Sequence, residues 1–473
     1  MSKNTTSNDN KKTLKTASYN MIANVFSLII GMAMIPIISR VLPQEDLGLA
    51  TTFIANRNIL VIFVTLSIYS YFNRAMIEYE KERIDYSFAV VFFCFISILI
   101  FFLICLPIRE FVQSLLSLND FLYTWLFISM FCFAVYSITN YYCIFHNKSK
   151  LVFFIVLTVG PISQILSIIL ALVMTSDKYI GRIIGLDAMY VIITLFFSAW
   201  LISKGFRKIK TAYIKESLFF SIPLIPHLLS QNVLTQCDLI MITYFVGADK
   251  TGIYSMGHTI GFLAFTVMSQ ILAAWSPWVY RRLKNKECSS IKKNSTLMIL
   301  MGFYLSVGLM SISPELVTLF LPDSYREAIY IIPPLVTAMF FQYLYIFFYD
   351  LQYYFKKTHL IALCSIIAAA INFVLNILLI PTIGYISACY TTMIGYFALF
   401  LLNLIFTIKY RPKEIYDLKA MVSCSLFLIV YMMIMMFFAD NIFARYFALI
   451  VLTIFFLVRK GSDILSIIKA LRQ

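Results

Sequence analysis

Arg57 is the residue whose type and position point most directly to chemistry. It is the one charge in the apolar stretch ATTFIANRNILVIFV, residues 50–64. If this stretch belongs to a membrane-spanning helix that begins near Gly48, Arg57 lies about 13 Å along it, close to the middle of the bilayer. An ionisable residue at that depth is a functional candidate. A guanidinium stays charged and can hold two phosphate oxygens, so we expect Arg57 either to bind pyrophosphate or to pair with a carboxylate of a neighbouring helix.

Four further polar residues lie in apolar runs. Asp187 has a depth similar to that of Arg57, and we expect it either to neutralise Arg57 or to bind a coupling cation. His227 and His258 lie near mid-depth and could carry a proton or contact phosphate, or could hydrogen-bond between helices. Asn24 has a second asparagine four positions earlier on the same helix face. These amides suit sugar hydroxyls, although hydrogen bonds between helices are their commoner use.

Motifs for several kinds of catalysis do not occur in the sequence. It has no GxxxxGK[ST] loop, no HExxH and no GxSxG. The nine cysteines are scattered without a CxxC pair, which argues against a metal site or a disulfide framework. We therefore expect no catalytic residues, no metal and no cofactor. Energy would come from an ion gradient (H⁺ or Na⁺), from an opposing substrate or from mass action.

The composition excludes a water-soluble chain. Of its 473 residues, 61% are hydrophobic and 13% are charged, whereas ordinary globular domains have about 45–50% and about 25%. The polar, basic segment 1–16 precedes an apolar run that is too long for a cleaved signal peptide. A spanning helix needs roughly 20 apolar residues. This rule predicts an all-α polytopic membrane protein with about fourteen spans: 17–39, 48–71, 87–107, 119–145, 151–175, 179–203, 217–246, 250–280, 295–312, 327–354, 358–380, 383–408, 418–438 and 441–458.

The basic residues predict the orientation of these spans. If the N-terminus is cytoplasmic, 30 of the 38 Lys and Arg residues fall in cytoplasmic segments and seven in external ones, with Arg57 left inside a span. A bias of this kind indicates that both termini are cytoplasmic. The net charge of +15 is then an orientation signal, and we expect no nucleic-acid partner.

Two pairs of similar segments indicate an internal repeat. ISRVLPQEDLGL at 38–49 matches ITYFVGADKTGI at 242–253, and IGRIIG at 180–185 matches IGYISA at 383–388, at offsets of 204 and 203 residues. Each pair relates span n to span n+6, so the two copies share one orientation across the membrane. We expect two six-helix lobes with a cleft between them and an additional C-terminal pair of spans. The expected segments are a cytoplasmic tail (1–16), an N-lobe (17–203), a basic linker (204–216), a C-lobe (217–408), spans thirteen and fourteen (409–458) and a cytoplasmic tail (459–473).

Pro223 and Pro226 stand near the start of the seventh span. Prolines break backbone hydrogen bonds and allow a helix to kink. A straight helix over 217–246 would be roughly 45 Å long, which exceeds a hydrocarbon core of about 30 Å. We therefore expect a bend at these prolines, which would serve as a hinge between the lobes.

Several motifs resemble those of a known family. The segments are SIPLIPHLLS (221–230), DLIMI (238–242), FVGAD (245–249), TGIYS (251–255), GRIIG (181–185), IIPP (331–334) and NFVLNILLIP (372–381). Together with the number of spans and the repeat, they resemble polysaccharide flippases, the lipid-linked oligosaccharide translocases of the MATE-like exporter superfamily.

The resemblance implies a V-shaped, two-lobe transporter in a bacterial plasma (inner) membrane. Its cargo would be an undecaprenyl-pyrophosphate-linked oligosaccharide, as in the biosynthesis of O-antigen of lipopolysaccharide or of capsule. Membrane lipids, and a polymerase and chain-length proteins of the same pathway, would be its partners. In this family cavity arginines are thought to bind the cargo, which favours Arg57.

Two other classes remain as alternatives. A cation-coupled drug antiporter of the same superfamily would have twelve core spans and a more acidic cavity. An integral membrane glycan polymerase or ligase would carry a large external loop with catalytic residues, whereas the external segments here are short.

Overall fold

A computed structural model describes residues 26–27, 29–146, 148–204, 209–409 and 415–454, apart from the side chain of residue 274. Within these ranges the regular structure is helical throughout, with no strand. Among the described residues, twelve helices are long and apolar enough to span a membrane, and the shorter apolar helices Ile29–Val41 and Ile442–Ile454 correspond to the first and last predicted spans. The predicted fold class, an all-α multi-pass membrane protein, is confirmed. The predicted tails at 1–16 and 459–473 lie outside the described residues.

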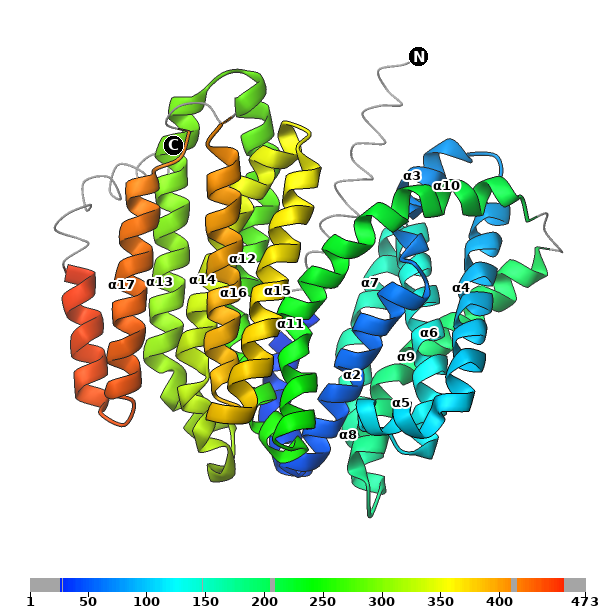
Figure 1. Cartoon of the computed structure of the whole chain (residues 1–473), viewed down its shortest axis with the longest axis horizontal. Coiled ribbons are helices and arrows are strands. Elements are labelled where there is room, and N and C mark those ends of the chain that lie inside the picture. Colours follow the sequence, from blue (N-terminus) through cyan, green and yellow to red (C-terminus); the bar gives the residue numbers. More distant parts are fainter. Residues whose placement is uncertain (1–25, 28, 147, 205–208, 410–414, 455–473) are drawn as a thin grey trace. The chain divides into compact units, whose positions relative to one another are not determined.

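The chain divides into two compact units, Met1–Gly252 and Ile253–Gln473. The first unit contains the start of α12 (Ala248–Lys284) and these helices (Figure 1): α2 (Gln44–Val64), α3 (Phe72–Glu78), α4 (Arg83–Cys105), α5 (Arg109–Leu116), α6 (Asp120–Phe145), α7 (Ser149–Leu157), α8 (Ser163–Val173), α9 (Lys178–Ser203), α10 (Thr211–Ser221) and α11 (Ile225–Phe245). The second unit contains the rest of α12 and α13 (Cys288–Phe320), α14 (Ile332–Tyr354), α15 (Thr358–Ile383), α16 (Ser387–Thr407) and α17 (Leu418–Phe437).

The division between the units differs from the basic linker expected at 204–216. It falls at Gly252, inside α12, and α10 and α11 belong to the first unit. The reason is that α11 packs along α2. The six-helix lobes, as bodies that move during transport, stay a prediction.

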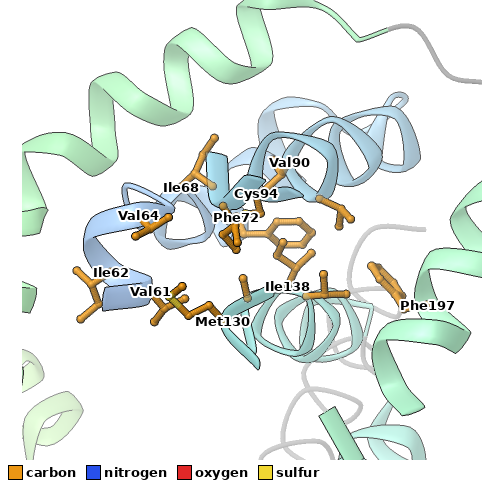
Figure 2. Packing of buried hydrophobic residues seen from close by; sticks show 14 of the residues in the cluster. Val61, Ile62, Val64, Ile68, Phe72, Val90, Cys94, Met130, Ile138 and Phe197 are labelled. Carbon is orange, nitrogen blue, oxygen red and sulfur yellow. The ribbon is translucent and has the colours of Figure 1, made fainter. Parts of the chain in front are cut away.

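A continuous apolar core holds the first unit together. It is built from α2, α3, α4, α6 and α9, and Figure 2 shows Val61, Phe72, Val90, Met130 and Phe197, one from each of these helices. The core therefore fixes the helices α2, α6 and α9 relative to one another.

The second predicted span, 48–71, ends earlier than expected. α2 stops at Val64, and Leu66 and Ser67 take left-handed backbone conformations with φ of 49° and 45°. A short 3₁₀ turn over Ile68–Tyr71 then leads into α3. No glycine or proline stands at this break, so local sequence signals do not reveal it.

The seventh span is interrupted where the two prolines stand. α10 ends at Ser221, a 3₁₀ turn covers Ile222–Leu224 with Pro223 in it, and α11 begins at Ile225 with Pro226 in its first turn. Figure 1 shows that α10 and α11 run in different directions. The expected bend is therefore present, and its use as a hinge between lobes stays a prediction.

Hydrogen bonds between tyrosines and carboxylates connect α10 to the short segment between α3 and α4. Tyr213 on α10 donates to Glu82, and Tyr79 donates to Glu216 on α10. Lys210 Nζ adds a 2.5 Å contact with Glu82 Oε1. These contacts connect α10 to the segment between α3 and α4. The distribution of basic residues predicts that this segment is cytoplasmic.

The second unit is built around α14. Its side chains are almost all buried, among them Phe340, Phe341 and Tyr343, and it packs against α13, α15, α16 and α17. Gly302 on α13 lets the ring of Tyr343 approach, because a Cβ there would lie 2.6 Å from that ring.

Candidate functional site

Arg57 and Asp187 form a buried ion pair inside the first unit. Arg57 Nη1 donates to Asp187 Oδ1 at 2.5 Å, and the two side chains are 6% and 1% exposed. Arg57 comes from α2 and Asp187 from α9, which lie against each other. Of the two partners expected for Arg57, pyrophosphate or a carboxylate of a neighbouring helix, the carboxylate is therefore present.

Trp125 on α6 completes the coordination of the carboxylate. Its indole Nε1 donates to Asp187 Oδ2 at 3.0 Å. Both oxygens of Asp187 therefore accept a hydrogen bond, one from a guanidinium and one from an indole. This satisfies a carboxylate that would otherwise be costly to bury.

Aromatic rings and small polar groups enclose the guanidinium. Its central carbon lies 5.1 Å from the ring centre of Phe133 and 5.3 Å from that of Tyr190, distances at which ring faces attract a cation. Ser129 Oγ accepts from Arg57 Nη1 at 3.4 Å, and Asn58 Oδ1 accepts from Nη2 at 3.3 Å. None of the contacts that Arg57 makes with described residues is to a histidine.

The arrangement is a cation and an anion that neutralise each other inside the first unit. A pyrophosphate that reached Arg57 would compete with the single charge of Asp187 for the same N–H donors. A released Asp187 would then need a proton or a cation. Any anion that bound Arg57 would therefore have to displace Asp187 from these donors.

The other predicted site residues are distributed over both units. His227 is half-buried on α11 in the first unit. His258 is half-buried on α12 in the second unit and stacks on Phe262, with ring centres 4.0 Å apart. Asn24 lies outside the described residues. The roles of these three residues stay predictions.

Two residues of this region were missed by the sequence reasoning. Trp125 lies near the start of its predicted span, and nothing in its spacing shows that it contacts Asp187. Arg182 was counted as an external basic residue, yet it is 8% exposed within α9. The signal that could have revealed it is the pair Gly181 and Gly185 around it, because small residues at this spacing let helices pack closely.

Asp350 is a buried carboxylate in the second unit. It accepts from Ser276 Oγ at 2.7 Å and from Tyr280 OH at 2.9 Å. No cation among the described residues forms an ion pair with it. It is therefore held by hydroxyl groups alone, unlike Asp187.

Solved structures with the same fold support the architecture. The lipid II flippase MurJ in an inward closed conformation is 16% identical, with a TM-score of 0.68 over 94% of this chain and 99% of that chain. An inward-facing multidrug resistance MATE family transporter of the MOP superfamily is 12% identical, with a TM-score of 0.60 over 84% of this chain and 97% of that chain. A MATE in complex with MaD3S is also 12% identical, with a TM-score of 0.55 over 84% of this chain and 95% of that chain.

The family of the chain follows from its sequence. No curated protein matches it. Residues 13–283, more than half of the chain, match the family described as polysaccharide biosynthesis protein. The match runs from residue 13 to the end of the first unit, including both residues of the buried ion pair, and on through most of α12. The chain therefore belongs to the polysaccharide biosynthesis protein family.

Proposed function

We propose that this protein is a flippase for undecaprenyl-pyrophosphate-linked oligosaccharide repeat units. It would move them from the cytoplasmic to the outer leaflet of a bacterial plasma membrane, by alternating access, for the biosynthesis of a surface polysaccharide such as O-antigen or capsule. Family membership supports this proposal. Its partners would be the lipid-linked cargo, membrane lipids and the polymerase and chain-length proteins that act on the flipped product.

The observation that carries the proposal is the extent of the likeness to a lipid flippase. The MurJ structure covers 94% of this chain, whereas the MATE structures cover 84%. The difference is about the size of one pair of spans. This greater coverage by a lipid flippase supports the proposal, and a long polyprenyl chain is a cargo for which helices beyond a twelve-helix core would have a use.

In the proposed cycle Arg57 supplies the fixed positive charge for the pyrophosphate. The described state has Asp187 on the guanidinium. Cargo pyrophosphate would replace Asp187, and Asp187 would then take up a proton or Na⁺, which would couple transport to an ion gradient. His227, His258 and Asn24 are the further residues that we propose for contact with the headgroup.

A cation-coupled drug antiporter is the second candidate. The structural likeness to MATE transporters, with TM-scores of 0.60 and 0.55, favours it. It would use the same exchange at Asp187 with an organic cation as cargo.

A leaflet assay tests the proposal and separates the candidates. The chain is removed from a strain whose surface glycan depends on it, and the lipid-linked repeat unit is quantified on each face of the membrane. We expect the unit to accumulate on the cytoplasmic face, and wild-type chain to restore export. Unpolymerised units on the outer face would instead indicate a polymerase or ligase. Drug sensitivity with a normal surface glycan would indicate the antiporter.

A further inference from the structure

Arg182 is a buried cation to which the described part of the chain supplies no carboxylate partner. Three arginines are buried among the described residues. Arg57 pairs with Asp187, and Arg445 pairs with Glu315. Arg182 donates from Nη1 to the hydroxyl of Ser167 on α8, and no carboxylate within the described ranges forms an ion pair with it.

Two glycines fix the position of Arg182 between α8 and α9. A Cβ at Gly181 would lie 2.7 Å from the carbonyl group of Leu170, and a Cβ at Gly185 would lie 2.2 Å from Cα of Ser167. The backbones of α8 and α9 are therefore in direct contact. Arg182 lies between the two glycines in sequence and is held where the helices meet, so its guanidinium cannot move freely into water.

The charge is costly where it stands. A guanidinium carries five N–H donors and stays protonated, and here one hydroxyl is its protein acceptor. Burying a charge without a counter-charge is strongly unfavourable. The positive end of the dipole of α9 is also at this end of the helix and adds to the unfavourable potential. An anion would relieve all three effects.

The depth of Arg182 matches the level of lipid phosphate groups. α9 has 26 residues and is about 39 Å long, longer than a hydrocarbon core of about 30 Å. The excess of about 9 Å is shared between the two ends of the helix, and its first turn is on the side predicted to be external. Arg182 is four residues into α9, about 6 Å from its start, so the predicted topology places it near the boundary between acyl chains and headgroups.

We propose that Arg182 and Ser167 bind the diphosphate of a polyprenyl diphosphate in the outer leaflet. The site would receive the headgroup after it leaves Arg57, because Asp187 is five residues further along the same helix, about 7 to 8 Å away. This inference rests on the proposed function. The ligand chemistry is a lipid-borne phosphate, which the cargo or a bulk anionic phospholipid could provide.

Binding to the purified full-length chain in detergent tests the site. Native mass spectrometry would measure undecaprenyl pyrophosphate and phosphatidylglycerol separately, with inorganic pyrophosphate as the headgroup alone. For Arg182→Met we expect binding of undecaprenyl pyrophosphate to weaken at least about tenfold, as for loss of charge-assisted hydrogen bonds. Arg182→Lys should lose less, because it keeps the charge without the fork. Arg40→Ala, an exposed arginine on the same predicted side, should bind as wild type does.

Thermal unfolding distinguishes a binding residue from a structural one. Without ligand, Arg182→Met should unfold at the same temperature as wild type or higher, since it removes an uncompensated charge; a structural arginine would give a lower temperature. If Arg182→Met does not fold, the role is structural and the inference fails. If wild type binds undecaprenyl pyrophosphate and Arg182→Met binds it equally, or loses phosphatidylglycerol alone, the inference fails while the proposed function stands. If wild type binds no undecaprenyl pyrophosphate, the proposed function fails with it.

Discussion

Gly48 and Gly252 lie in two helical segments whose backbones approach each other closely at both glycines. A Cβ on Gly48 would lie 1.8 Å from the carbonyl oxygen of Ala248, and a Cβ on Gly252 would lie 2.1 Å from that of Gln44. Residues 44 and 48 are 204 positions before 248 and 252, which is the offset of the first pair of similar segments. The contact is therefore reciprocal: the first turns of α2 and α12, equivalent in the repeat, pack against each other through equivalent atoms.

Gly48→Ala and Gly252→Ala should each destabilise the chain. The obstacle in both cases is a backbone carbonyl, which cannot rotate away as a side chain can. We expect a cost at or above the upper end of the usual 1–3 kcal/mol for overpacking, measured as a fall in unfolding temperature in detergent. Gly308→Ala is the matched control, since Gly308 lies in helix α13 with open space around its missing Cβ. It should be neutral or stabilise by about 0.5–1 kcal/mol. Equal behaviour of all three variants would contradict the reciprocal contact.

The ion pair predicts a specific pattern of double-mutant energies. Asp187→Asn should cost about 3–5 kcal/mol, because it leaves Arg57 charged and buried. The combined change Arg57→Met and Asp187→Leu should restore most of this stability, because neither charge remains. Asp120→Asn removes the carboxylate of the exposed pair with Arg109, whose side chains are 41% and 83% exposed, and should cost less than about 1 kcal/mol.

Transport by the same double variant separates the two roles of Arg57. A stable double variant without transport would show that the charges of the pair act in transport, as proposed for Arg57 with the cargo and for Asp187 with the coupling cation. A stable double variant that transports normally would show that the pair is structural. Arg57→Ala alone cannot make this distinction, since it leaves Asp187 buried without its partner.

The spans could be predicted from the sequence because a bilayer imposes one length on every helix that crosses it. The same constraint allows the depths of Arg57 and Asp187 in the bilayer to be compared from the sequence alone. The end of α2 at Val64 could not be predicted in this way. Leu66 and Ser67 adopt left-handed conformations without a glycine or proline, so the break depends on tertiary packing.

The surroundings of the charged residues also depend on packing. Arg182 lies close to the predicted end of a span and is one of the seven basic residues counted as external, but the contact between α8 and α9 buries it. The second pair of similar segments shows the same limit. Gly181 is inside helix α9, whereas Gly384 precedes α16 with a φ of 102°. Identical residues in this second pair of segments therefore do not occupy structurally equivalent positions.

Acid should loosen α10. The hydrogen bonds from Lys210 and Tyr213 hold the pKa of Glu82 below its ordinary value of 4.5. A lowered folded-state pKa gives stability that is fully present above the ordinary value and is lost as the pH falls through the folded-state value. We expect the rate of amide hydrogen exchange in α10 of the wild type to rise as the pH falls below about 4.5. It should then approach the rate in Glu82→Gln at the same pH, because this variant lacks the carboxylate at every pH. Glu80→Gln, which changes an exposed glutamate next to it, should keep the wild-type profile. A wild-type profile in Glu82→Gln as well would exclude this contact as the cause.

Cys288 offers a direct test of orientation. It is the one cysteine of the chain that is not buried, and it is the first residue of α13, at the end predicted to be cytoplasmic. A membrane-impermeant maleimide added to intact cells should leave it unlabelled, and a permeant one should label it. Asp323→Cys, which adds an exposed cysteine at the opposite end of α13, should be labelled by both. The reverse pattern would invert the predicted topology.

Arg445 should hold the last helix to the second unit. It lies in Ile442–Ile454, is 4% exposed, and contacts Glu315 on α13 through two N–H···O bonds of 2.8 and 2.6 Å. Glu315→Gln would leave the buried guanidinium without a counter-charge. Because Glu315 is 36% exposed, we expect a loss of about 1–3 kcal/mol rather than the full cost of a buried pair. Asp440→Asn is the control, since its pair with Arg326 has the same chemistry at 68% and 65% exposure and should contribute at most about 1 kcal/mol. Thermal unfolding gives both values, and an equal loss in the two variants would mean that burial of Arg445 adds nothing to the attachment of the last helix.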